Sequence, residues 1–356
     1  MDGIIPAWGK ILRGITPNLS IEITRECPLR CPGCYAYGDD HLGGDVNLRS
    51  LADYKGQELV DRVKALVIQR NPLHLSIIGG EPLVRYRELG EILPWLAERG
   101  VYTQLVTSAV RPIPREWAGL HRLLIAVSID GLQPEHDARR APATYDRILT
   151  HIEGHRITVH CTVTAQQSRR SGYIDEFVRF WSAQDTTRRI WFSLYTPQVG
   201  ETSDECLTDP DRRRLVAELL ALGPRYPKLK ASRRALEGYL EPPSSPDECI
   251  FARTTDCLSA DLETRIEPCQ IGGRPDCSRC GCLASAGLAA VGRFQLPGGL
   301  PVARVLGWSE AVGRVVGRIT GRASAAPAPA RPRIIPVQPV PAKACQPVSG
   351  PSGDMS

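Results

Sequence analysis

The ten residues ECPLRCPGCY, positions 26–35, place three cysteines in one short loop. Three thiolates can bind three irons of a cubane iron–sulfur cluster and leave the fourth iron open, so that an external molecule can bind there and receive an electron. Pro28 and Pro32 exclude a regular helix, because each lacks an N–H group and has a fixed φ. The stretch therefore predicts a loop wrapped around an inorganic cluster. The predicted ligands, and hence the predicted catalytic residues, are Cys27, Cys31 and Cys34.

Two other uses of this loop fit less well. A structural zinc ion usually takes four protein ligands, and the loop offers three. Disulfides form in oxidising compartments, whereas the start of the chain, MDGIIP, lacks the basic region and long apolar stretch of a secretory signal. The sequence contains no apolar run long enough to span a bilayer. We therefore predict a cytoplasmic protein, in which twelve cysteines point to metal or cluster binding rather than to disulfides. The isolated Cys161, Cys206 and Cys345 are expected to be free thiols.

The chain length and the net charge limit the domain organisation and the partners that we expect. The 356 residues are enough for a barrel-sized core and a smaller appended module. The net charge of +5 comes mostly from arginines spread along the chain. A solvated arginine-rich surface explains this mild excess better than a nucleic-acid site does, so nucleic acid is not the expected partner.

Short β-like runs alternate with amphipathic helical patterns from residue 20 to about residue 196. This alternation predicts an α/β fold with parallel strands and crossover helices. Periodicity alone does not separate a partial barrel from an open doubly wound sheet. The predicted strands are 20–24, 73–78, 102–108, 123–129, 157–164 and 190–196, and the predicted helices between them include 53–69, 85–99, 144–153 and 172–184.

Polar residues share one face of several predicted strands. A fully packed barrel favours branched apolar residues on its inner face. Polar inner faces therefore suit a partial barrel whose interior holds a polar cofactor. The residues concerned are Ser20, Glu22 and Thr24, then Ser128 and Asp130, then His160, Thr162 and Thr164.

The cysteine spacing, Cys-x3-Cys-x2-Cys followed by an aromatic residue, resembles the signature of the radical S-adenosylmethionine (radical SAM) superfamily. The resemblance implies a partial (β/α)6 barrel, a [4Fe-4S] cluster on the three cysteines and S-adenosyl-L-methionine on the open iron. It also implies reductive cleavage of this cofactor to a 5′-deoxyadenosyl radical, which attacks an unactivated carbon of the substrate. Tyr35 takes the aromatic position, which in the family lies near the adenine.

A glycine turn follows the second predicted strand. In Gly79-Gly80-Glu81, the glycines allow a ligand to approach the backbone closely and the carboxylate can accept hydrogen bonds from an ammonium group. A tight turn alone would show the same residues. Because the turn comes one βα unit after the cysteine loop, it resembles the family motif that binds the amino group of the cofactor's methionine.

Polar residues after the next strands complete the predicted cofactor site. Ser128 and Asp130 resemble family positions that bind the cofactor's ribose or carboxylate, although an Asp-Gly turn alone would give the same pattern. Ser108 lies at the end of the third strand, where family members contact the cofactor. Arg140 matches the arginine of the family stretch His-Asp-x-x-Arg-Gly and is expected to pair with the cofactor carboxylate, with Arg139 beside it.

A second group of cysteines occupies residues 249–282. It resembles the SPASM or shorter twitch module of radical SAM enzymes and implies an auxiliary [4Fe-4S] cluster. The resemblance is incomplete, because Thr264 replaces a glycine and the closing Cys-x2-Cys-x-Cys is compressed. A zinc site of four thiolates, or thiols without metal, are the alternatives. The predicted ligands are Cys257, Cys269, Cys277, Cys280 and Cys282, with Cys249 just upstream.

We predict six segments along the chain. They are an amphipathic N-terminal segment (1–16), the radical SAM core barrel (17–200), a helical connector (201–248), the small cysteine-rich iron–sulfur module (249–284), a C-terminal helical segment (285–321) and a disordered Pro/Ala-rich tail (322–356).

The resemblance implies a radical SAM enzyme and leaves its substrate open. The cysteine-rich module favours a peptide, whereas other stretches are similar to radical SAM enzymes of lipid assembly. An electron donor such as flavodoxin or ferredoxin is implied as a partner. An iron–sulfur carrier or scaffold without turnover is one alternative, and an RNA-modifying radical SAM enzyme, supported by arginine content alone, is another. The loop 35–41 and His160 are the predicted substrate neighbours.

Overall fold

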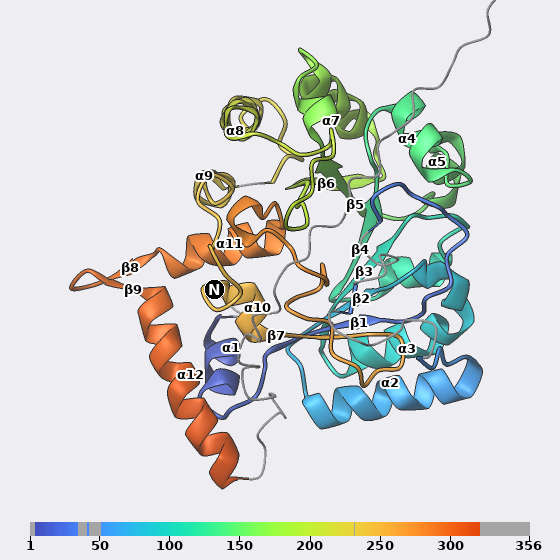
Figure 1. Ribbon diagram of the computed structural model, residues 1–356. Helices are drawn as coiled ribbons and strands as arrows, with labels where there is room; N and C mark the ends of the chain where they lie inside the picture. The colour runs from blue at the N-terminus through green and yellow to red at the C-terminus, as the bar shows by residue number, and fades with distance from the viewer. Residues whose placement is uncertain (1–3, 35–40, 43–50, 231, 321–356) are drawn as a thin grey trace, which may run out of the picture. The chain divides into compact units, whose positions relative to one another are not determined.

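Seven parallel strands form the central sheet of the computed structural model (Figure 1). The structure describes residues 4–34, 41–42, 51–230 and 232–320. The chain divides into two compact units, Met1–Ser324 and Ala325–Ser356, and every described residue lies in the first. The predicted tail therefore lies outside the described residues.

The strands follow the order β6-β5-β4-β3-β2-β1-β7. Six of them overlap the six predicted strands, and the main difference is that β6 begins earlier. Strands β1 to β6 follow one another in chain order, without the reversal of a doubly wound sheet, and the sheet stays open at β6 and β7, as in a partial barrel. The six are β1 (Asn18–Glu22), β2 (His74–Ile78), β3 (Tyr102–Thr107), β4 (Leu123–Ser128), β5 (Ile157–Val163) and β6 (Thr187–Leu194).

The seventh strand, β7 (Thr255–Leu258), comes from the cysteine-rich segment. It runs parallel to β1 and places Cys257 opposite Ser20. At the other edge, the backbone N–H of Leu194 in β6 donates to the carbonyl of Gly281 (2.8 Å). The segment that we predicted as an appended module therefore supplies one strand of the core sheet and also contacts the opposite edge.

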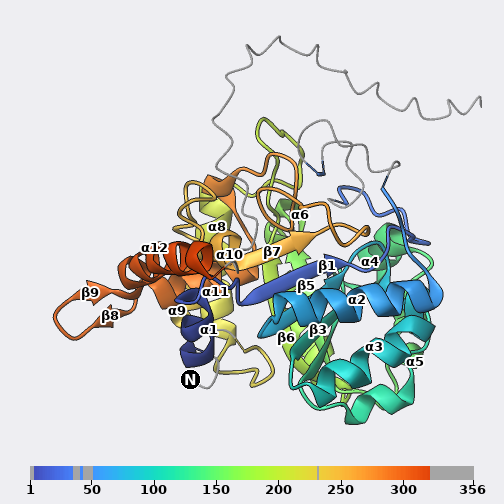
Figure 2. The ribbon, with the colours of Figure 1, turned by 90° about the horizontal axis from the view of Figure 1, so that it is seen from below.

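Helices connect the strands and cover the sheet (Figures 1 and 2). Between β1 and β6 they are α2 (Gly56–Arg70), η3 (Pro82–Arg85), α3 (Tyr86–Glu98), η4 (Arg115–Gly119), α4 (Gln133–Arg140), α5 (Tyr145–His151), α6 (Ala165–Ser168) and α7 (Tyr173–Ala183). Around them lie α1 (Ile4–Ile11), α8 (Asp209–Leu222), α9 (Arg233–Glu237), α10 (Ile250–Thr254), η5 (Cys277–Arg279), α11 (Leu283–Gly292), the hairpin β8 (Gln295–Leu296) and β9 (Leu300–Pro301), and α12 (Val302–Ile319).

The core lies between the sheet and its covering helices. In β1 and β2, Leu19, Ile21, Leu75 and Ile77 are buried, and the helices bury residues at helical spacing. A helix with such a stripe packs its apolar side on the sheet, and each buried large side chain contributes about 1.5–3 kcal/mol. For α2 the buried residues are Leu59, Val60, Val63, Leu66 and Val67, and for α7 they are Tyr173, Ile174, Phe177, Val178 and Trp181.

Helices α1 and α12 lie side by side (Figures 1 and 2). The indole N–H of Trp8 donates to the hydroxyl of Ser309 (2.8 Å). The two backbones approach so closely that a Cβ on Gly313 would lie 1.9 Å from the carbonyl oxygen of Ile11. This crossing therefore requires glycine at position 313.

Replacing Gly313 with alanine should destabilise the protein by about 1–3 kcal/mol, because the added methyl group overlaps the backbone of Ile11. Thermal unfolding of the full chain measures the effect. Gly287→Ala in α11 is the matched control, since a Cβ there meets no atom within 4 Å and alanine should stabilise the helix by about 0.5–1 kcal/mol. Equal effects of the two substitutions would contradict the close crossing.

Candidate functional site

The three cysteines of the predicted cluster loop follow β1 directly. All three are partly buried, and the N–H of Cys34 donates to the carbonyl of Cys31 (3.3 Å) across a turn in which Gly33 has a φ of 65°. Burial, together with the nearby Glu81, Cys31 and Cys34, raises the pKa of Cys27 to about 11. Burial also raises the pKa of Cys31. Burial thus disfavours the free thiolates of Cys27 and Cys31, whereas metal coordination deprotonates a thiol outright. The three thiols therefore fit as ligands of a bound cluster.

The glycine turn after β2 forms hydrogen bonds to the residues that lead into this loop. The N–H of Gly80 donates to the carbonyl of Thr24 (2.8 Å), and the N–H of Glu81 donates to the carbonyl of Glu26 (2.9 Å). Gly79 has a φ of 131°, and a Cβ there would lie 2.5 Å from the oxygen of Thr24. The predicted cofactor turn is thus also a support for the cysteine loop.

A cluster of charged residues binds the same residues that lead into the loop. The Asp53 carboxylate accepts from the hydroxyl of Thr24 (3.1 Å) and from the N–H of Arg25 (3.0 Å). The buried guanidinium of Arg85 donates to Asp53 (3.2 Å) and to Glu26 (2.9 Å). Hydrogen bonds from Arg85 and Lys55 lower the pKa of Glu26 to about 2. The Glu26 carboxylate therefore stays charged at neutral pH and can hold this ion pair.

Arg139 binds the C-terminal part of the loop. Its guanidinium donates to the carbonyl of Pro32 (2.8 Å) and forms an ion pair with Glu205, which comes from the segment after β6. Gly33 lies under this pair, since a Cβ there would be 3.2 Å from Glu205 Oε2. The sequence did not single out Glu205, because no local pattern links it to a loop so far away in the chain.

Arg140 joins the two predicted cofactor residues Asp130 and Ser108. It donates to the Asp130 carboxylate (2.6 Å) and to the Ser108 hydroxyl (3.0 Å). Burial opposes the charge on Asp130, but Arg140 and Arg139 overcome this effect and hold its pKa below the usual value. Asp130 and the Cys31 thiolate charge in turn raise the pKa of Arg140 against the effect of its burial. The structure thus places a permanent cation beside the cysteine loop.

Ser128 and His160 are register neighbours on β4 and β5. The Nε2 atom of His160 lies 2.8 Å from the hydroxyl of Ser193. Burial lowers the pKa of His160 to about 4, so this imidazole is neutral at physiological pH. A neutral polar face on these strands suits an uncharged part of a ligand.

The Glu81 carboxylate is fully buried and already has three donors within the protein. It accepts from the N–H of Leu83 (2.9 Å), the N–H of Ser108 (2.7 Å) and the hydroxyl of Thr107. It therefore joins the ends of β2 and β3, a role that the sequence did not suggest. Contact with an ammonium group remains a prediction for the turn as a whole. Tyr35 lies outside the described residues.

A buried polar link connects β1 with two distant segments. Glu22 Oε1 lies 2.8 Å from His41 Nε2, and Glu22 Oε2 accepts from the Ser259 hydroxyl (2.9 Å). The neighbouring Ser20 donates to Gln270 (3.0 Å). The polar face predicted for this strand is thus engaged by protein groups, and the predicted substrate neighbour His41 is part of this link.

The C-terminal cysteines lie close enough to influence one another's ionisation. Burial, together with charges on Cys257, Cys280 and Cys249, raises the pKa of Cys269 to about 12. Burial likewise raises the pKa of Cys257 to about 12 and that of Cys277 to about 11. It also raises the pKa values of Cys280 and Cys282. These cysteines, with Cys249, therefore lie in one neighbourhood of the structure, and their role as cluster ligands stays a prediction.

Neither disulfides nor a single-ion site were found in the part of the chain that the structure describes. The eleven cysteines there form no disulfide. Groups of three or more His, Cys, Asp or Glu side chains placed to hold one metal ion are likewise absent from these residues.

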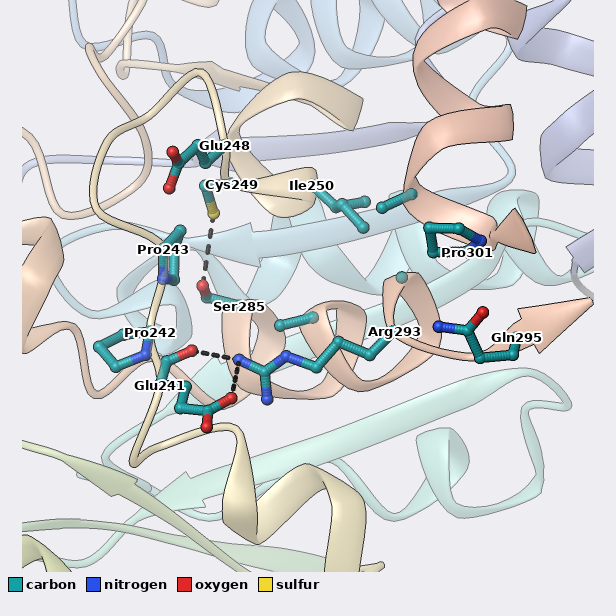
Figure 3. A pocket seen from close by; sticks show the side chains of 13 residues that line it. Glu241, Pro242, Pro243, Glu248, Cys249, Ile250, Ser285, Arg293, Gln295 and Pro301 are labelled. Carbon is teal, nitrogen blue, oxygen red and sulfur yellow. Dashed lines mark hydrogen bonds and ion pairs between the residues drawn. The ribbon is translucent and has the colours of Figure 1, made fainter. Parts of the chain in front are cut away.

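A cavity of about 450 Å³ lies beside Cys249 (Figure 3). The thiol of Cys249 and the hydroxyl of Ser285 face each other there, 3.3 Å apart. Arg293, also in its wall, forms an ion pair with Glu241 (3.4 Å). The cavity is lined by the C-terminal half of the chain and includes none of the triad cysteines.

Replacing Arg139 with glutamine should destabilise the protein by about 1–3 kcal/mol, because it removes a charge-assisted bond to the cysteine loop and leaves Glu205 unpaired. It should also broaden the electron paramagnetic resonance signal of the reconstituted, reduced protein, since the loop loses its fixed position. The control is Arg170→Gln, which removes an exposed ion pair with Glu135 and should cost less than about 1 kcal/mol. An unchanged spectrum for Arg139→Gln would argue against the positioning role.

Known proteins share part of this sequence. Residues 21–164 match the model of the radical SAM superfamily. A PqqA peptide cyclase of Methylobacterium nodulans is 32% identical over 105 residues, which are 28% of this chain and 25% of the cyclase. A PqqA peptide cyclase of Bradyrhizobium diazoefficiens is 34% identical over 101 residues, which are 27% of this chain and 23% of the cyclase. The matched stretch thus spans about a quarter of the length of each cyclase.

Solved structures share the fold. Streptococcus suis SuiB bound to S-adenosylmethionine has a TM-score of 0.52 at 19% identity, over 73% of this chain and 62% of SuiB. SuiB bound to its precursor peptide SuiA has a TM-score of 0.54 at 17% identity, over 83% of this chain and 71% of SuiB. The stretch that carries the cysteine triad, the glycine turn and the Asp130–Arg140 pair is the part of the chain that matches the radical SAM superfamily model.

Proposed function

We propose that the protein is a radical SAM enzyme that modifies an unactivated carbon of a peptide. The observation that carries this proposal is the cysteine triad, held at both ends and faced by the Arg140 cation within a stretch that matches the superfamily model. Three thiols with no fourth cysteine in the same loop suit a cluster that keeps one iron open.

The bound [4Fe-4S] cluster and S-adenosyl-L-methionine would supply one-electron cleavage of a sulfonium bond. The protein's residues bind and orient the reactants. Cys27, Cys31 and Cys34 would hold the cluster, and the cation of Arg140 would attract a carboxylate while Asp130 and Ser108 fix its direction. His160 stays neutral and adds no charge to the interior.

A peptide is the substrate class that the comparisons support best. The curated relatives are named for cyclising the peptide PqqA, and SuiB is a structural neighbour that was solved with its precursor peptide. The lipid that the sequence left open has no such support. The electron donor and the cytoplasmic location stay predictions.

An auxiliary [4Fe-4S] cluster at the C-terminal cysteines is part of the same proposal. Its support is the gathering of six buried or half-buried thiols, Cys249 among them, in one electrostatic neighbourhood. Six thiols are enough to ligate one cluster fully and too few to ligate two. Zinc remains the competing metal for this site.

Replacing Cys31 with alanine should abolish formation of 5′-deoxyadenosine, because the cluster loses one of its three ligands. The assay uses the full chain, reconstituted with iron and sulfide without oxygen, then given S-adenosyl-L-methionine and a strong reductant. Cys206→Ala is the control, since Cys206 belongs to neither cysteine group, and it should keep the activity. Product from the Cys31→Ala protein at the wild-type rate would refute the proposal.

Iron analysis of the same preparations tests the auxiliary cluster. The wild type should hold about eight irons per chain, and Cys280→Ala should hold about four while the triad keeps its cluster. An iron content of about four in the wild type, with zinc present, would assign the C-terminal cysteines to zinc instead.

A further inference from the structure

The outward side of α12 carries large apolar residues at helical spacing. Trp308, Val312, Val315 and Ile319 are 57%, 51%, 56% and 80% exposed. At 100° per residue they fall on one side of the helix. The opposite side packs on the protein, because Leu306, Ser309, Gly313 and Gly317 are buried. We call the four exposed residues the α12 stripe.

Helix α1, which packs beside α12, also exposes apolar side chains. Ile5 is 79% exposed and Leu12, just after the helix, is 39% exposed. The glycine crossing at Gly313 and the bond from Trp8 to Ser309 hold the two helices together. Both helices of this pair therefore expose apolar side chains, and a contiguous exposed apolar surface marks a place where something docks.

The exposed charged residues of α12 are all positive. Arg304, Arg314 and Arg318 are exposed on α12, and by helical geometry they lie between the stripe and the buried side. The one acidic residue of the helix, Glu310, is paired with Arg253 and its side chain is only 15% exposed. An apolar stripe with tryptophan, flanked by arginines, is the pattern of a helix that lies in the plane of a membrane surface.

We propose that α12, with α1, docks on the surface of an anionic lipid bilayer. The apolar side chains would enter the boundary between head groups and acyl chains, and the arginines would contact phosphate groups. This docking is peripheral, since none of the described helices combines the length and apolar character that a bilayer crossing demands. A second copy of the chain fits less well, because two facing stripes would bring their arginines together without an available acid on α12.

The proposal is independent of the radical chemistry. The α12 stripe shares no residue with the cysteine triad, the glycine turn or the Asp130–Arg140 pair. Vesicle binding can therefore fail while the cofactor assay succeeds, and the reverse can also occur.

The test is co-sedimentation of the full chain with two kinds of vesicle. One contains phosphatidylglycerol in phosphatidylcholine, and the other contains phosphatidylcholine alone. We expect binding to the anionic vesicles that weakens as salt is added. Val315→Glu should reduce this binding roughly tenfold or more, because a valine that would enter the apolar part of the bilayer is replaced by a charge. Ile68→Glu on α2 is the matched control, since Ile68 is 57% exposed, and it should bind like the wild type.

The arginines provide a second variant that leaves the apolar residues in place. Replacing Arg314 and Arg318 with glutamine should weaken binding by about fivefold per residue. Thermal unfolding shows whether each variant is folded. Equal binding to both kinds of vesicle, or equal binding of Val315→Glu and the wild type, would overturn the proposal. So would a wild-type dimer in gel filtration that ignores vesicles and that Val315→Glu converts to a monomer, since the occupant would then be a second copy.

Discussion

The cysteine loop depends on hydrogen bonds that it cannot make within itself. Two prolines remove donors from the stretch, and its carbonyl groups need partners from elsewhere. The glycine turn after β2 supplies backbone donors to Thr24 and Glu26, and the Arg139 side chain supplies one to Pro32. Each support comes from a different βα unit. The position of the three thiols is therefore a property of the whole partial barrel.

The same barrel neutralises the charges that surround the thiols. Asp130 is buried with Arg140 and Arg139, and Glu22 is buried with His41 and Ser259. A buried carboxylate without a partner would be strongly unfavourable. These pairs join residues from β1 and β4 to helix α4 and to the C-terminal segment. These buried charges are therefore paired only when the segments that form the site come together.

Much of the fold follows from local patterns, while the long-range contacts do not. Alternating apolar residues and helical spacing predicted six strands and the helices between them, because these periods reflect burial along one element. Strand β7 was missed, since four residues that include an aspartate and a cysteine do not stand out from a cysteine-rich loop. The sequence predicted Arg140 as the functional arginine but gave no role to Arg139, whose partner Glu205 is 66 residues away.

In the candidate site, too, local features were predictable from the sequence and long-range contacts were not. The cysteine triad is recognisable from spacing, because its ligands lie within one loop. The burial of the Glu81 carboxylate against Thr107 and Ser108 is not recognisable, because it arises where two strand ends meet. An acidic residue inside a strand, such as Glu22, was a signal that a buried partner exists, but its partners come from other segments.

The pairing of β7 with β1 has a consequence for biosynthesis. Asn18 at the start of β1 bonds to Thr254, 236 residues later in the chain. During translation at about 5–20 residues per second, the outer edge of the first strand waits for roughly ten seconds to a minute before its neighbour emerges. An uncovered strand edge can pair with other nascent chains. We therefore expect the yield of native protein to depend on the rate of synthesis and on chaperones that shield this edge.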